Sequence, residues 1–326
     1  MLLLSDVALA AVTGLLVVNA LAERPSVPVL FAAEALATAA YSFQRPARNA
    51  LTPKLVPEDQ LLAAIAVEDV FFNLSRVAGP ALAGLLITTI GLAGAYGVDL
   101  ATFGSSLASI WLLPKLPPTG DVERPSVRSI VDGFRYVRGN SALLGIFTVD
   151  TIAMIFGMPS ALFPAFAETL GGGAGTVGLL YAAPSAGALA ASLVSGWMTR
   201  VVRQGLGVTI AAGAWGVAIG AVGLARSVPL VLALLAVAGA ADFVSAVLRS
   251  TIMLQATPDA MRGRMSGIEL AQVAGSPALG NLEAGAVASL VGIRASIVSG
   301  GVLCVAGTAA VALLVPSFVR YRRPFA

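Results

Sequence analysis

Ten apolar runs, separated by short polar segments, occupy most of this chain. An α-helix needs about 20 predominantly apolar residues to cross the hydrocarbon core of a bilayer. The composition agrees, because 57% of the residues are hydrophobic and 11% are charged, whereas a water-soluble domain carries about 25% charged residues. The runs lack the period-two alternation of membrane-spanning strands. The sequence therefore predicts an all-α integral membrane protein. The ten predicted spans are 2–22, 29–43, 60–90, 95–113, 143–166, 177–198, 208–225, 229–247, 265–290 and 295–315.

The basic residues lie mainly in the loops on one side of the predicted membrane. Fifteen Lys and Arg residues lie on that side, against Arg24, Arg226 and Arg294 on the other. Loops rich in Lys and Arg stay in the cytoplasm. Both termini are therefore expected in the cytoplasm, with the cell (inner) membrane as the location. The net charge of +3 does not indicate a nucleic-acid partner, because it comes from these short loops.

An internal repeat predicts two related bundles of helices. The segment Arg48–Glu58 is answered by Arg249–Asp259, at an offset of 249 − 48 = 201. Further along, Gly79–Leu82 is similar in sequence to Gly275–Leu279, and the offset between their prolines is 277 − 80 = 197. The slip of four residues is about one helical turn, which keeps the same helix face. A repeat at this spacing is typical of transporters built from two bundles.

The one long polar stretch separates these bundles. We predict an N-terminal four-span bundle at 1–113, a cytoplasmic linker at 114–141 and a C-terminal six-span bundle at 142–326 that ends in a short basic tail. Within the linker, apolar residues recur at helical spacing, which predicts an amphipathic helix along the membrane surface. An offset of 201 leaves 143–198 without a counterpart. Two spans of a six-plus-six parent are therefore expected to be missing before residue 1, through a shortened gene product or a start-site error.

The segments Val56–Leu61, Gly79–Gly84 and Ala256–Arg264, with two bundles joined by a basic loop, resemble the major facilitator superfamily. In particular, the whole chain is similar to drug and siderophore exporters of the enterobactin-exporter and macrolide-efflux type. The resemblance implies export of a small amphipathic molecule by proton antiport. It also implies that Gly79–Gly84 is the export-associated Gly-Pro-x-x-Gly-Gly motif, in which Leu85 replaces the last glycine. The alternative interpretation is a transport-incompetent, truncated remnant that acts at most as a membrane interaction partner.

Charged residues inside the predicted spans are the first candidates for a transport site, because burying a charge in a membrane is costly. Arg76 and Asp150 are predicted near the midplane and would form an ion pair between the bundles. That pair would either couple transport to a proton or substrate, or hold the bundles in register as a static contact. Glu34 and Asp242 are further candidates, and Asp69 and Asn73 share a helix face with Arg76. Other acidic residues are expected nearer an interface with water, namely Asp6, Glu68, Asp99, Glu269 and Glu283, and Asp69 belongs with them by depth.

Glycine and proline interruptions of the spans are candidates for conformational hinges or close helix packing. The alternative for each is a packing kink without substrate contact. These candidates are Gly79, Pro80, Gly84, Gly157, Pro159, Gly275 and Pro277.

The residue inventory argues against an enzyme. The chain has no histidine and one cysteine, Cys304, which removes histidine-based catalytic dyads, histidine zinc motifs and an intrachain disulfide. It also lacks a phosphate-binding loop of the Gly-x-x-x-x-Gly-Lys-Ser/Thr kind, so ATP hydrolysis by this chain is not expected. No catalytic residue, metal or cofactor is predicted. The expected partners are a small-molecule substrate, the lipid bilayer and protons.

Overall fold

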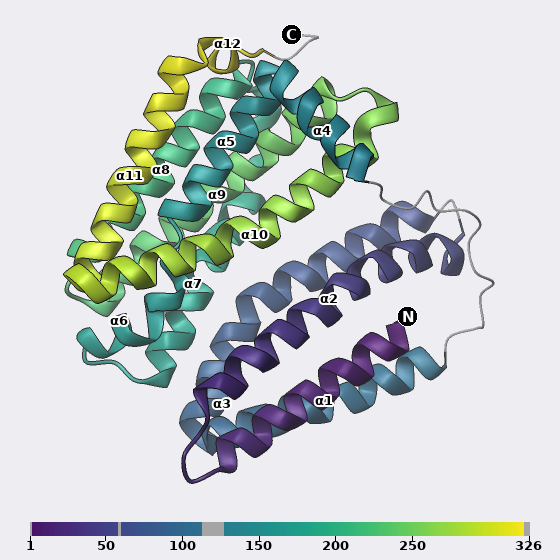
Figure 1. Cartoon of the computed structure of the whole chain (residues 1–326), viewed down its shortest axis with the longest axis vertical. Coiled ribbons are helices and arrows are strands. Elements are labelled where there is room, and N and C mark those ends of the chain that lie inside the picture. The colour runs from purple at the N-terminus through teal and green to yellow at the C-terminus, as the bar shows by residue number, and fades with distance from the viewer. Residues whose placement is uncertain (1, 58–59, 113–126, 323–326) are drawn as a thin grey trace. The chain divides into compact units, whose positions relative to one another are not determined.

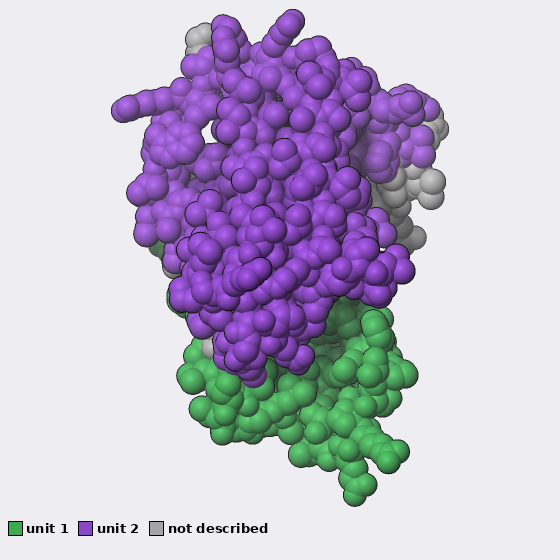
Figure 2. Space-filling view, turned by 90° about the vertical axis from the view of Figure 1, so that its left-hand side faces the viewer, with its two compact units in different colours: residues 1–122 green, residues 123–326 purple. Residues whose placement is uncertain are grey.

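The computed structural model describes residues 2–57, 60–112 and 127–322, and some side chains within 42–81, 127–130 and 259–263 also lie outside this description. All regular elements in the described ranges are helices, which confirms the all-α class. The chain divides into two compact units, Met1–Val122 and Glu123–Ala326, shown in green and purple in Figure 2. This division falls inside the predicted linker. The boundaries predicted for the two bundles otherwise remain a prediction.

The first unit contains three long helices. They are α1 (Leu2–Leu21), α2 (Val27–Leu55) and α3 (Leu61–Trp111), and α1 packs against both of the others (Figure 1). The polar segment between the predicted spans 29–43 and 60–90 is helical in its first part, because α2 continues to Leu55 and the backbone becomes extended at Val56. Ala, Leu and Arg favour a helix wherever the backbone is satisfied, so a polar sequence by itself does not end one.

The long helix α3 is interrupted at Gly91, where φ is 76° and ψ is 173°. A positive φ of this size is accessible to glycine at little cost, because glycine has no Cβ. At Gly79-Pro80 the backbone stays helical, since Gly91 is the residue of α3 given non-helical torsions among those that the structure describes. The interruption therefore separates the predicted third and fourth spans, and Pro80 lies within continuous helix.

The second unit contains nine α-helices in the described residues (Figure 1). These are α4 (Val127–Gly139), α5 (Ser141–Phe156), α6 (Phe163–Thr169), α7 (Ala174–Leu193), α8 (Gln204–Leu224), α9 (Val228–Ala256), α10 (Asp259–Val291), α11 (Ile293–Leu314) and α12 (Pro316–Val319). The predicted run 143–166 is broken after Phe156, and a short 3₁₀ turn at Ser160–Leu162 leads into α6. The predicted amphipathic helix is present as α4, which packs against α5 and α10.

The backbone confirms the internal repeat. Helix α2 begins after Ser26 and α9 begins after Ser227, both with a proline in the first turn, and the two helices are each 29 residues long. The break at Gly91 is matched by Gly292, where φ is 89° and ψ is 159°. All these pairs are separated by 201 residues, as 292 − 91 = 201 shows for the glycines. The same offset places Pro277 over residue 76 rather than over Pro80, so the Gly/Pro motifs of the two halves differ by about one helical turn.

Small residues allow the closest helix contacts of the second unit. A Cβ atom at Gly187 of α7 would lie 1.8 Å from the Ala236 carbonyl oxygen of α9, and one at Gly239 would lie 1.8 Å from the Pro184 carbonyl oxygen. Between α8 and α11, a Cβ at Gly301 would lie 2.4 Å from the backbone nitrogen of Gly220. Such backbone approach is typical of helices that associate within lipid. It holds α7–α9 and α8–α11 as tightly packed pairs.

The outward-facing surfaces match a lipid environment. Leu193, Leu290, Leu313 and Leu314 are each at least 80% exposed, and large exposed apolar areas mark contact with a nonaqueous partner. Seven described segments are long and apolar enough to cross a membrane, and 27–41 is a shorter apolar helix. Helix α10 is not among the seven, because Glu269, Gln272, Asn281 and Glu283 lower its hydropathy. Ten spans therefore remain a prediction.

Candidate functional site

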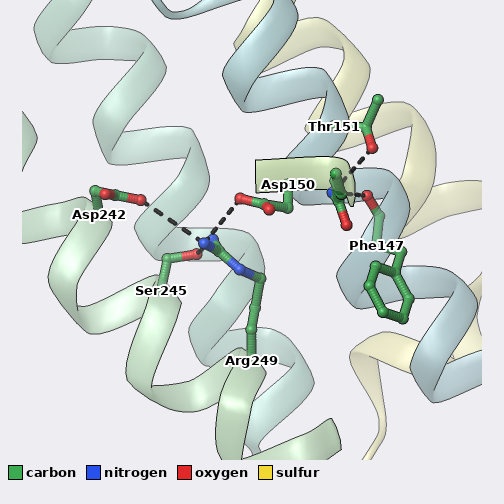
Figure 3. Close-up of polar contacts among 7 residues, drawn as sticks. Phe147, Asp150, Thr151, Asp242, Ser245 and Arg249 are labelled. Atoms are coloured by element: carbon green, nitrogen blue, oxygen red, sulfur yellow. Dashed lines mark hydrogen bonds and ion pairs between the residues drawn. The ribbon is translucent and has the colours of Figure 1, made fainter. Parts of the chain in front are cut away.

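Two helices place charged side chains at one position inside the second unit. Asn140 caps the start of α5, because its side-chain oxygen accepts hydrogen bonds from the backbone N–H groups of Ala142 and Leu143. The helix carries Asp150 on its buried face. Helix α9 carries Asp242, Ser245 and Arg249 at positions i, i+3 and i+7. Residues at this spacing share one face of a helix. That face is turned toward α5 (Figure 3).

The Arg249 guanidinium is the centre of this cluster. Its Nη2 lies 2.8 Å from Asp150 Oδ1 and 3.8 Å from Asp242 Oδ1, while Nη1 donates a hydrogen bond of 2.6 Å to Ser245 Oγ (Figure 3). The side chains of Arg249 and Asp150 are only 16% and 10% exposed, whereas that of Asp242 is 38% exposed. Asp242 is thus the more accessible of the two carboxylates, and Asp150 is the deeper one.

Several charged side chains of the described residues meet in this cluster. One guanidinium faces two carboxylates, and Glu269 of α10 lines the same small pocket as Asp150 and Arg249. Carboxylates held close together within a membrane-embedded bundle repel one another, which is costly. Binding one proton or one cation would reduce that cost. In this arrangement a carboxylate can therefore either pair with Arg249 or bind a proton in its place.

The pocket beside the ion pair is narrow and is walled by α5, α9 and α10. It has a volume of about 20 Å³, which is room for about one water molecule. On its α10 side, Gln272 donates hydrogen bonds of 2.9 Å to the Phe147 carbonyl oxygen and to Thr151 Oγ1. Because these acceptors lie on both sides of Asp150 in the sequence, Gln272 ties α10 to the turn of α5 that carries this carboxylate.

The predicted site residues are only partly brought together. Asp150 and Asp242 meet at the same guanidinium. Glu34 is exposed on α2, where it accepts a hydrogen bond of 3.5 Å from Thr38. The side chains of Asp69, Asn73 and Arg76 lie outside the described residues. The predicted ion pair between Arg76 and Asp150 therefore stays a prediction, and the described partner of Asp150 is Arg249.

The glycine and proline candidates behave differently from one another. Gly157 ends α5, and a Cβ atom there would lie 2.4 Å from Trp215 Nε1, so close packing requires glycine. Pro159 immediately precedes the 3₁₀ turn. Among the described residues, no heavy atom lies within 4 Å of a Cβ placed at Gly79 or Gly275. Gly84 is buried, and Pro277 lies inside continuous helix as Pro80 does.

Three buried or clustered polar residues are not among the predicted site residues, namely Arg249, Glu269 and Asp6. In the sequence, Arg249 begins the second copy of the internal repeat. Its spacing from Asp242 and Ser245 places all three on one helix face, and this pattern could have predicted that it joins the site. Glu269 and Asp6 were expected near an interface, yet Glu269 lines the Asp150 pocket and Asp6 is 1% exposed. Asp6 accepts hydrogen bonds from Gln44 and Ser106, which come from α2 and α3. Burial of this kind depends on helix neighbours rather than on depth along one helix.

Comparison with known proteins shows the family of this chain and a similar fold in a solved structure. Residues 1–320 match the major facilitator family described as transmembrane secretion effector. The enterobactin exporter EntS of Citrobacter koseri is 32% identical over 276 residues, which cover 84% of this chain and 66% of that protein. EntS of Escherichia coli O127:H6 is 32% identical over 231 residues, covering 71% and 56%. The chain thus spans less than two thirds of the length of these relatives.

A solved structure extends the fold comparison. A POT family transporter, crystallised in complex with a thioalcohol-conjugated peptide, superposes with a TM-score of 0.72 over 97% of this chain and 81% of its own. Its sequence is 12% identical. At this level of sequence identity, the similarity shows a shared fold alone.

Proposed function

Because this chain belongs to the transmembrane secretion effector family of the major facilitator superfamily, we propose that it is a secondary active transporter that exports a small amphipathic molecule. The relatives named as enterobactin exporters support export as the direction and a siderophore-like molecule as one candidate cargo, and a drug-like molecule is the other candidate. As the chain spans 66% and 56% of those relatives, its activity and its cargo both belong to the proposal.

The proposed topology is the ten-span arrangement of four spans followed by six. It counts α3 as two spans separated at Gly91 and includes the less apolar α2 and α10. The protein would lie in the inner membrane. Both of its termini would be in the cytoplasm, because the basic loops lie on that side. The repeat between the two units supports alternating access, in which related bundles rock about a site near the membrane midplane.

Proton antiport is the proposed source of energy, and the cluster of Asp150, Arg249 and Asp242 is the observation that carries it. A proton that enters from outside would neutralise one carboxylate and leave Arg249 balanced by the other. Loss of the Asp150 contact would remove the ion pair that links α5 to α9 at 2.8 Å and so weaken the contact between these helices. Release of the proton to the cytoplasm would restore the pair. Each cycle would thus couple a change in charge to a change in helix contact.

Transport by the full chain in proteoliposomes tests this function. Inside-out vesicles with an acidic lumen should accumulate a fluorescent amphiphile or a catecholate siderophore, and a protonophore that collapses the pH gradient should abolish this accumulation. Inclusion of both cargo types separates the drug-like from the siderophore-like proposal. Equal accumulation with and without the gradient would contradict antiport, and no accumulation of any cargo would contradict the transporter itself.

A further inference from the structure

A second cavity of the second unit lies at the opposite end of α8 from the cluster of basic loops. It has a volume of about 480 Å³ and is formed where α8 ends and α11 begins. Its lining combines cationic with apolar side chains: Leu224, Arg226, Arg294, Val298, Ser299 and Val302. The positive-inside rule places this end on the non-cytoplasmic side. The Asp150 site does not share any of these residues.

Arg294 is held in place at the head of this groove. Its Nη1 donates hydrogen bonds to the carbonyl oxygens of Gly223 and Ala225, at the C-terminal end of α8. Its guanidinium also lies over the Phe166 ring, 5.2 Å from the centroid, in a cation–π contact. These contacts use Nη1 and one face of the guanidinium. The Nε and Nη2 donors of the fork take no part in them, and an Arg fork matches the geometry of phosphate oxygens.

A second positive charge and a helix end reinforce the head of the groove. Arg226 is exposed in the loop after α8 and lines the same cavity. Helix α11 starts at Ile293, directly before Arg294, and the N-terminal end of a helix carries partial positive charge. The described residues that line this cavity include two arginines and no acidic side chain. The head of the groove is therefore complementary to an anion.

The rest of the groove runs along an exposed side of α11. Val298 and Val302 follow Arg294 at successive turns, and Val302 is 59% exposed while Leu224 is 70% exposed. At about 1.5 Å per residue, Val302 lies about 12 Å along the helix from Arg294. This is the distance over which a lipid passes from its head group into its acyl chains. A soluble anion would contact only the charged end.

We propose that this groove binds one anionic phospholipid of the non-cytoplasmic leaflet. Its phosphate contacts Arg226 and Arg294, and one acyl chain lies against Val298 and Val302. The bound lipid would hold the end of α8 against the start of α11. A zwitterionic lipid offers the same acyl chains but no net negative charge, so the two arginines distinguish between the two lipid classes.

The test is a lipid titration of the purified full-length protein by native mass spectrometry, with phosphatidylglycerol and phosphatidylcholine as probes. Arg226→Gln is the main variant, because Arg226 is exposed and its loss should not disturb folding. We expect its affinity for the first phosphatidylglycerol to fall about fivefold, as one basic residue near a membrane surface contributes about 1 kcal/mol. Arg24→Gln is the matched control, since Arg24 is an exposed arginine of the same predicted side in the other unit.

Three outcomes would overturn the proposal. Phosphatidylcholine that binds as tightly as phosphatidylglycerol would remove the role of charge. An unchanged affinity in Arg226→Gln, or an equal loss in Arg24→Gln, would place the lipid elsewhere. Displacement of the lipid by millimolar inorganic phosphate would indicate a small-anion site without acyl-chain contact. None of these measurements depends on transport, so failure here and failure of the proposed function are distinguishable.

Discussion

Asp150 of α5 and Arg249 of α9 form an ion pair of 2.8 Å, although the two helices are separated in the sequence by α6, α7 and α8. Both side chains are shielded from solvent, with exposures of 10% and 16%. Removing one partner of a shielded pair leaves the other charge uncompensated, whereas removing both charges together does not. This relationship makes the stability of the second unit depend on the pair as a whole.

We predict that Arg249→Ala destabilises the protein by about 3–5 kcal/mol, because Asp150 then remains buried without its cation. The measurement is unfolding of the purified protein in mixed micelles, followed by circular dichroism. The double variant Asp150→Asn with Arg249→Gln should recover part of the loss, because only the more exposed Asp242 then lacks its cation. The interpretation of a shielded ion pair would be wrong if the single variant were as stable as the wild type, or if the double variant were no more stable than the single.

Gly157→Ala should destabilise the end of α5 by about 1–3 kcal/mol, the usual cost of overpacking. The added methyl group would lie 2.4 Å from Trp215 Nε1 and 2.7 Å from the Ala153 carbonyl oxygen. Trp215 fluorescence should shift with the displacement. Gly79→Ala is the control, because the described surroundings leave space there and alanine favours a helix. Equal effects of the two substitutions would contradict this packing account.

Cysteine labelling tests the proposed orientation. Native Cys304 is fully buried, so a membrane-impermeant maleimide should leave the wild type unlabelled. In intact cells we expect Arg24→Cys to react and Arg320→Cys to react only after permeabilisation, since these exposed positions lie on opposite predicted sides. The reverse pattern would invert the orientation. Labelling of both from outside would contradict the odd number of spans, nine, that the proposed topology places between them.

Much of the fold could be predicted from the sequence because its signals are local. The serine and proline at the starts of α2 and α9 recur with the repeat, as do the glycines at 91 and 292. Each acts through its own backbone torsions, which neighbouring helices hardly change. A proline can lie within a transmembrane helix without ending it, as Pro80 does in α3, so the hinge role of Gly79-Pro80 stays a prediction. The positive φ that interrupts α3 requires a glycine. Because the chain has many glycines, the sequence alone does not show which of them adopts it.

The site was less predictable because it depends on which helices become neighbours. Asp150 and Asp242 were found as charges inside apolar runs, and this signal requires only the sequence. The described partner of Asp150 is Arg249, which the packing of α5 against α9 within one unit brings to it, and the pair with Arg76 stays a prediction. Glu269 and Gln272 join the same pocket because α10 crosses α5. No pattern within a single helix specifies such crossings.

The central claim is that a proton on Asp150 couples export to the pH gradient, and Asp150→Asn tests it most directly. Two assays in proteoliposomes are compared: accumulation driven by a pH gradient, and exchange of labelled for unlabelled substrate without a gradient. Glu168→Gln, at an exposed position of α6, is the control. The account predicts that Asp150→Asn keeps exchange, which requires no net proton movement, and loses gradient-driven accumulation. Accumulation by Asp150→Asn at the level of the wild type, with the same pH dependence, would contradict it.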